Sequence, residues 1–154
     1  MTVQDRRDVD VLAELVRRRA VDDVATMDYR RTLVRAAATH TQTEVAKVLH
    51  VSQPALSQQL KTAKKTPEVP EGFSGAGPYE ICQRYAAGEI GREQLLDELA
   101  RWPYTPIPQP VWLDDITPSP GPGSFREVMR AADEGLIDGA TYDEVQRRRF
   151  PGVA

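Results

Sequence analysis

Apolar side chains recur at helical spacing in the first 40 residues. One stripe contains Val11, Leu12, Leu15 and Val16, and a second contains Tyr29, Leu33, Val34 and Ala37. Apolar residues three and four positions apart share one face of a helix. The pattern predicts two helices here, with a break near residues 21–23.

Capping residues then mark the start of another helix. Thr41 followed by Glu44 matches a capping box, in which the hydroxyl and the carboxylate each accept a hydrogen bond from an orphan backbone N–H. This helix is predicted to run through Leu49 and to end in a tight turn at residues 50–51. His50 stands where such a turn favours a residue that tolerates positive φ.

A further helix is predicted directly after this turn. Ser52 is a favourable N-cap, and Pro54 falls in the first helical turn, where its missing N–H does no harm. The helix should reach about Lys64. No pair of strands suited to form a wing follows it.

The remainder reads as two helical hairpins joined by proline-rich segments. Residues 67–78 are rich in glycine and proline and indicate a linker, and residues 103–123 contain seven prolines and should be extended. Helices are predicted at residues 79–87, 92–101, 124–134 and 141–149. The predicted fold is all-α, with a domain over residues 1–66, a linker over 67–78 and a helical-hairpin region over 79–154.

The two hairpins resemble each other in sequence. "YEICQRYAAGEI" at residues 79–90 aligns with "REVMRAADEGLI" at residues 126–137 at an offset of 47 residues, which pairs Glu80 with Glu127 and Gly88 with Gly135. Either two related hairpins pack on each other, each too small to be stable alone, or amphipathic helices are similar by chance.

Charge is distributed unevenly along the chain. Residues 28–66 have seven Lys/Arg and two acids, a balance of +5, whereas residues 67–154 have eight Arg and fifteen acids, a balance of −7. This asymmetry indicates a basic binding module followed by an acidic region with another task. The chain has a single cysteine, Cys82, so an intramolecular disulfide is excluded. We interpret this cysteine as a small, buried apolar side chain.

Residues 42–60, "QTEVAKVLHVSQPALSQQL", have the spacing of a helix-turn-helix. The positions expected to point inward are Val45, Ala46, Leu49, Val51, Leu56 and Leu60. The segment resembles bacterial helix-turn-helix transcriptional regulators, and "LHVSQPALSQQL" is similar to the recognition helix of LysR-type regulators. The chain lacks the long α/β effector domain of that family, and phage-type repressors and antitoxins use the same element.

In this geometry the second helix lies in the major groove of double-stranded DNA. We predict base contacts from Gln53, Ser57 and Gln58, because Gln bonds bidentately to adenine and Ser bonds to either type of base. We predict contacts to the DNA backbone from Ser52, Lys47, Lys61, Lys64, Lys65 and Arg35. The alternative is a plain three-helix domain whose polar face is only solvated.

The favoured function is a DNA-binding repressor that acts as a homodimer, with the apolar stripe between Val11 and Val24 as the dimer seam. The alternative is an antitoxin-like protein whose acidic C-terminal region neutralises a protein partner. Neither a cofactor, a metal nor catalysis is predicted, since His40 and His50 have no evident nucleophile partner. The charged N-terminus and the lack of a long apolar run predict a cytoplasmic, nucleoid-associated protein without membrane contact.

Three aromatic residues remain open to two interpretations. Trp102, Tyr104 and Trp112 lie in or beside proline-rich sequence. They either anchor a partner from an exposed position or cover a small core.

Overall fold

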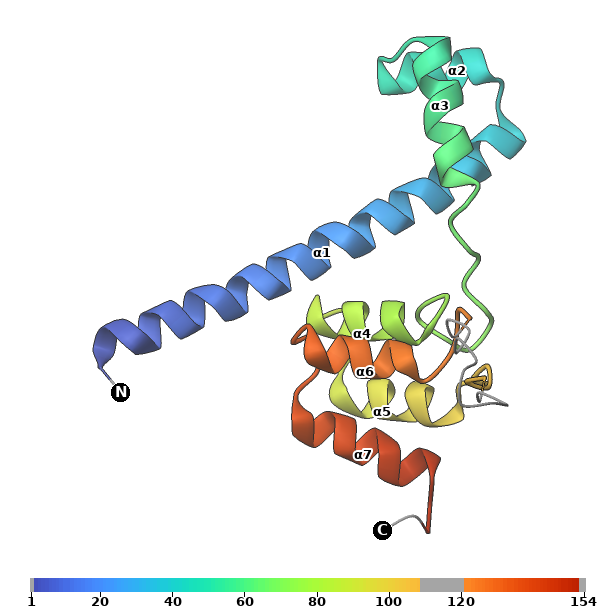
Figure 1. Cartoon of the computed structure of the whole chain (residues 1–154). Coiled ribbons are helices and arrows are strands. Elements are labelled where there is room, and N and C mark those ends of the chain that lie inside the picture. Colours follow the sequence, from blue (N-terminus) through green and yellow to red (C-terminus); the bar gives the residue numbers. More distant parts are fainter. Residues whose placement is uncertain (1, 109–120, 153–154) are drawn as a thin grey trace, which may run out of the picture. The chain divides into compact units, whose positions relative to one another are not determined.

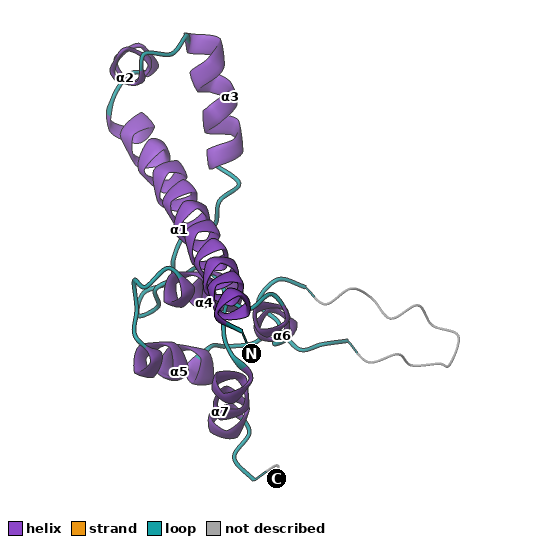
Figure 2. Cartoon of the chain, turned by 90° about the vertical axis from the view of Figure 1, so that its left-hand side faces the viewer, coloured by secondary structure: helices purple, strands orange, loops and turns teal. Residues whose placement is uncertain are grey.

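The computed structural model describes residues 2–108 and 121–152, and it is built from helices (Figure 1). The helices are α1 (Val3–Thr39), α2 (Gln42–Leu49), α3 (Gln53–Ala63), α4 (Pro78–Ala86), α5 (Arg92–Arg101), α6 (Arg126–Asp133) and α7 (Gly139–Arg149). Figure 2 shows helices and loops, and the described residues contain no strand. The predicted all-α fold class is confirmed.

The chain divides into two compact units. The central unit comprises residues 22–68, and the flanking unit comprises residues 1–21 and 69–154. The boundary at residues 21–22 falls within α1, so this helix contributes to both units. Of the proline-rich segment at residues 103–123, residues 109–120 lie outside the described part of the chain, as does Trp112.

Helix α1 is uninterrupted over 37 residues, so the predicted break near residues 21–23 was wrong. The helix contains neither glycine nor proline, and each Asp inside a helix costs at most about 0.7 kcal/mol relative to Ala. Charge pairs one turn apart support it further, since Arg18 Nε lies 2.7 Å from Glu14 Oε1. The second apolar stripe, which predicted a separate helix, lies on another face of the same helix.

The core of the central unit joins the C-terminal half of α1 to α2 and α3. Its buried members are Leu33, Val45, Ala46, Leu56, Leu60 and Ala63. Val34, Ala36, Ala37, Leu49 and Val51 pack against them. All six positions that the spacing placed inward lie in this cluster. Burying one leucine contributes roughly 1.5–3 kcal/mol, so the two buried leucines of α3 and Leu33 stabilise the packing of the three helices.

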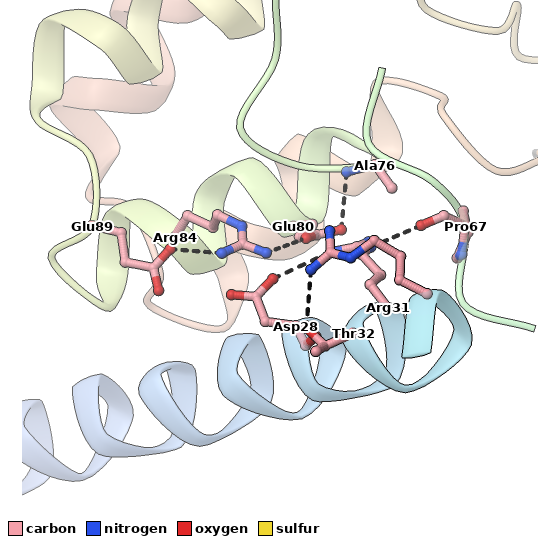
Figure 3. Close-up of polar contacts among 9 residues, drawn as sticks. Asp28, Arg31, Thr32, Pro67, Ala76, Glu80, Arg84 and Glu89 are labelled. Carbon is pink, nitrogen blue, oxygen red and sulfur yellow. Dashed lines mark hydrogen bonds and ion pairs between the residues drawn. The ribbon is translucent and has the colours of Figure 1, made fainter. Parts of the chain in front are cut away.

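Arg31 ties the end of the central unit back to α1 (Figure 3). Its Nε donates to the carbonyl of Pro67 over 3.0 Å, and its Nη1 lies 3.7 Å from Asp28 Oδ1. The chain that leaves α3 is therefore held against the helix that precedes α2.

In the flanking unit, α4 to α7 form two hairpins that pack on each other, as predicted. Helix α4 contacts α5 and α6, and α7 contacts α5 and α6. The helices lie within two residues of their predicted bounds. The side chains with no exposed surface are Ile81, Cys82, Leu95, Leu96, Leu99, Val128, Ala131 and Val145. Both hairpins contribute to this core.

The two hairpins share their turn geometry. Gly88 and Gly135, 47 residues apart, both have positive φ, of 85° and 78°. Gly88 N donates to Tyr85 O over 3.0 Å, and Gly135 N donates to Ala132 O over 3.1 Å. The next backbone amides repeat the pattern: Glu89 N donates to Arg84 O and Leu136 N donates to Ala131 O, each over 2.9 Å. The backbone thus matches at the offset that the sequence alignment gave.

The segment before α4 is held by side chains of the hairpins. The rings of Phe73 and Trp102 pack edge to face with their centroids 4.7 Å apart. Ser74 Oγ donates a hydrogen bond to Glu98 Oε2 over 2.6 Å. A Cβ on Gly75 would lie 2.8 Å from the backbone N of Ile81, so only glycine fits there. Trp102 is buried and covers the core, which settles the interpretation of that residue.

A charged cluster fastens α4 to this segment and to the following turn (Figure 3). Arg84 donates to Glu80 over 2.8 Å and to Glu89 over 2.7 Å, and the second oxygen of Glu80 accepts from Ala76 N over 2.9 Å. A carboxylate that bonds both a guanidinium and a backbone N–H fixes the start of α4.

Candidate nucleic-acid interface

The turn between α2 and α3 has the local geometry that the sequence predicted. Thr41 Oγ1 accepts from Glu44 N over 3.2 Å, and a Glu44 carboxylate oxygen accepts from Thr41 N over 3.0 Å, which completes the capping box. His50 ends α2 in the left-handed region, with φ 54° and ψ 41°. Val51 N donates back to Ala46 O over 3.1 Å, so the turn is closed by backbone hydrogen bonds.

The start of α3 is fixed by its cap and by one contact to α2. Ser52 Oγ accepts from Ala55 N over 3.3 Å, and Pro54 lies in the first turn. Gln53 Nε2 donates to Thr43 Oγ1 over 2.8 Å. The side chains that begin α2 and α3 therefore hold each other, which sets the angle between the two helices.

A polar groove of about 460 Å³ lies along α3 beside the start of α2. It is lined by Gln42, Pro54, Ser57, Gln58, Leu60, Lys61 and Lys64. We call this surface the α3 groove. Lys61 and Lys64 are exposed, as are Ser57 and Gln58. No carboxylate is among the residues that line the groove, so its two cations face no neutralising charge from the lining.

The chemistry of the α3 groove combines two kinds of donor. The Gln58 carboxamide and the Ser57 hydroxyl can each donate and accept hydrogen bonds, as base edges require. The ammonium groups of Lys61 and Lys64 are point charges on flexible stems, and they bind phosphate oxygens without reading sequence. The two uncharged residues precede Lys61, in the last turn of α3, and Lys64, its C-cap residue.

The structure brings four of the nine predicted contact residues together in the α3 groove: Ser57, Gln58, Lys61 and Lys64. The other five do not line it. Gln53 is bonded to Thr43 and the Ser52 hydroxyl caps α3. Lys47 and Lys65 are exposed elsewhere on the unit, and Arg35 Nη2 donates to Thr32 Oγ1 on α1 over 3.1 Å.

Sequence reasoning missed three residues that shape this surface. Gln42, the first residue of α2, lines the α3 groove, and its place directly after the predicted cap could have indicated this. Thr43 holds Gln53. Tyr29 Oη donates to Gln59 Oε1 over 2.8 Å. No local signal links these last two residues to their partners in α3.

Within residues 2–108 and 121–152, no group of three His, Cys, Asp or Glu side chains is placed to hold a metal ion. In the same part of the chain, the helices are all too short or too polar to cross a bilayer. His40 Nδ1 lies 2.9 Å from the hydroxyl of Thr39, a neighbour in sequence. The chemistry that the described residues offer at the α3 groove is binding by hydrogen bonds and by positive charge.

Comparison with known proteins gives no relative from which function can be read. No family model, no curated protein sequence and no solved structure matches the chain. The similarity of residues 42–60 to bacterial helix-turn-helix regulators therefore stays a prediction, and the case for function depends on the geometry and charge of the chain itself.

Proposed function

We propose that the chain is a sequence-specific DNA-binding transcriptional regulator, a repressor that acts as a dimer. Helices α2 and α3 would serve as a helix-turn-helix, with α3 in the major groove. The N-terminal residues of such a helix contact base edges, and the helix before it crosses the DNA backbone.

The α3 groove is the observation that carries this proposal. Ser57 and Gln58 are exposed on α3 and free of carboxylate neighbours in the groove lining, with Lys61 and Lys64 following on the same surface. An ordinary solvated helix face favours Glu and Lys, which have high helix propensity and increase solubility. Uncharged hydrogen-bonding side chains beside cations suit a surface that reads bases while it neutralises phosphates.

The capped turn supports the same function. A recognition helix must hold its angle when it enters DNA, and here the capping box, the His50 turn and the Gln53–Thr43 bond all fix α3 relative to α2. Surfaces that bind through a few side chains gain from such rigidity, because less conformational entropy is lost on binding.

The test is fluorescence anisotropy of the full chain on DNA from the region upstream of its own gene and on scrambled DNA, across a salt series. The proposal expects a preference for the upstream DNA and a steep decrease in affinity with salt. Gln58→Ala should cost roughly 1–3 kcal/mol on the specific site and little on scrambled DNA. Gln94→Ala, an exposed glutamine on α5, is the matched control and should change neither.

Two results would count against the proposal. Equal loss on both DNAs with Gln58→Ala would remove base reading from that residue. Equal affinity of the unaltered chain for both DNAs would contradict a sequence-specific regulator.

A second candidate function, antitoxin-like neutralisation of a protein partner, is supported by the charge of the C-terminal region. Residues 67–154 have a balance of −7, and their helices form a packed unit with a core. Acidic surfaces favour basic partners. A neighbouring reading frame whose product is toxic alone and harmless when co-expressed with this chain would favour this function.

A further inference from the structure

Helix α1 carries a line of exposed residues with the spacing of a coiled coil. The line, here called the α1 seam, consists of Val11, Leu15, Arg18, Asp22, Ala25 and Tyr29. Its intervals alternate between four and three residues, which keeps all members on one side of the helix. Val11 is 66% exposed, Leu15 is 64% exposed and Tyr29 is 46% exposed. Large apolar side chains repeated along one helix face mark an interaction surface.

The α1 seam is complementary to a second copy of itself that runs in the opposite direction. With the axis of symmetry at residue 20, Val11 meets Tyr29 of the other helix, Leu15 meets Ala25, and Arg18 meets Asp22. Each of these pairings occurs twice. A parallel pair in register would instead place Arg18 against Arg18 and Asp22 against Asp22. Like charges at such a seam oppose pairing, and opposite charges set the orientation.

We propose that α1 forms an antiparallel coiled coil with α1 of a second copy of this chain, centred near residue 20. Two reciprocal Arg18–Asp22 ion pairs lie at the centre of this interface, with apolar layers on both sides. Arg18 already extends along the helix surface to bond Glu14 over 2.7 Å, and its side chain is 71% exposed. The guanidinium has five donors, so it can bond Glu14 and the second copy's Asp22 together.

An apolar groove in the central unit continues the α1 seam. This groove, of about 270 Å³, is lined by Tyr29, Thr32, Leu33, Ala36, His40, Glu44, Val45, Val48 and Leu49. Val48 is 76% exposed at its edge. The proposed register brings Val11 of the second copy beside Tyr29, where the groove begins. Val11 would then cover the Tyr29 end of this apolar surface.

The antiparallel register also gives a spacing that suits DNA. In each copy, Leu33 joins α1 to the core that holds α2 and α3. Leu33 lies 13 residues from the axis at residue 20, so the two copies of Leu33 would be about 39 Å apart along the seam at 1.5 Å per residue. Half-sites read by a dimer are separated by roughly 34–36 Å, one turn of the double helix.

The first test is sedimentation equilibrium of the full chain without DNA. Arg18→Asp and Asp22→Arg should each weaken the dimer by at least about tenfold, because each places like charges together twice at the centre. The double variant, R18D with D22R, should restore it. A chain that is monomeric at all concentrations, or single variants that dimerise as well as the unaltered chain, would overturn the proposal.

The second test reports orientation through disulfide formation. Leu15→Cys and Ala25→Cys, mixed, should form an oxidised dimer, because the register places these positions opposite each other. Either variant alone should not, since identical positions would be about 15 Å apart and a disulfide needs Cα atoms within about 7 Å. The natural Cys82 is buried and does not compete. Cross-linking of L15C alone would show a parallel pair and overturn the antiparallel register.

This inference rests on the proposed function in one respect: the proposed repressor acts as a dimer, and the α1 seam would form the contact between its two copies. The two can fail separately, because both tests use free protein. A dimer that binds no specific DNA would leave the α1 seam intact and remove the regulator. A monomer that prefers its upstream DNA would support sequence-specific binding and contradict the α1 coiled coil.

Discussion

Tyr29 and Gln59 are joined by a hydrogen bond of 2.8 Å between the phenol and the side-chain carbonyl of the glutamine. The bond connects α1 to α3 within the central unit, across 30 residues of sequence. Of the consecutive glutamines at 58 and 59, one is thus engaged inside the unit and the other lines the α3 groove. Adjacent, chemically identical side chains have separate roles because a helix turns by about 100° per residue.

This division of roles gives a paired prediction. Gln59→Ala should lower the free energy of unfolding by about 0.5–1.5 kcal/mol, because a hydrogen bond between helices is lost. Gln58→Ala should leave stability within about 0.5 kcal/mol, as expected for an exposed position without such a bond. Urea denaturation followed by circular dichroism measures both. A larger loss for Gln58→Ala than for Gln59→Ala would contradict the assignment.

The turn between α2 and α3 gives a stabilising substitution. His50 has φ 54°, and it is the one residue other than glycine with positive φ among the described residues. His50→Gly should therefore raise stability by roughly 0.5–1 kcal/mol, since glycine adopts this region without steric cost. Thermal unfolding monitored at 222 nm tests this. The matched control is His40→Gly, whose φ is not positive, and which should destabilise the chain. The reverse order of the two variants would show that strain at His50 is negligible.

The parts of the fold that the sequence predicted are those determined by neighbouring residues. The capping box of Thr41 and Glu44, the N-cap at Ser52 and the turn at His50 each involve groups within five residues of one another. The bounds of α2 and α3 could be predicted from these residues, because caps and turns are local signals for where a helix begins and ends. The break predicted within α1 was wrong because no capping or breaking residue supported it, only a change in the exposed face.

The candidate site was predicted in part for the same reason. Ser57, Gln58, Lys61 and Lys64 follow from the period of α3 once Leu56 and Leu60 point inward. The bonds from Gln53 to Thr43 and from Tyr29 to Gln59 depend on how helices cross, which periodicity does not encode. The packing of Phe73 on Trp102 likewise depends on the tertiary structure, and the glycine and proline content from which a linker was predicted does not encode it.

The shared turn of the two hairpins predicts equal effects at equivalent glycines. Gly88→Ala and Gly135→Ala should each cost about 1–2 kcal/mol, because both residues have φ near +80° and an alanine Cβ is strained there. Gly139→Ala is the control, because a Cβ there meets no atom within 4 Å and its φ is not positive. It should be neutral or slightly stabilising. Chemical denaturation of the three variants gives the comparison, and a harmless Gly135→Ala beside a costly Gly88→Ala would contradict the equivalence.

The buried thiol of the flanking unit gives a pH-dependent prediction. Burial raises the pKa of Cys82 to about 12, and the nearby charge of Glu127 adds to the rise. The pKa of a cysteine thiol in an unfolded chain is about 8.5. Below that pH both states hold the proton, so the thiol adds no pH dependence. Above it the unfolded chain releases a proton that the folded chain retains, and the free energy of unfolding falls by about 1.4 kcal/mol per pH unit.

Comparison with Cys82→Ala isolates this effect. The two chains differ only at residue 82, so contributions from the rest of the chain cancel in the difference. The stability of the unaltered chain relative to Cys82→Ala should therefore fall by about 2 kcal/mol between pH 7.5 and pH 10. Urea denaturation at the two pH values measures it. A constant difference would mean that Cys82 ionises in the folded chain as readily as in the unfolded one, which its complete burial in the hairpin core opposes.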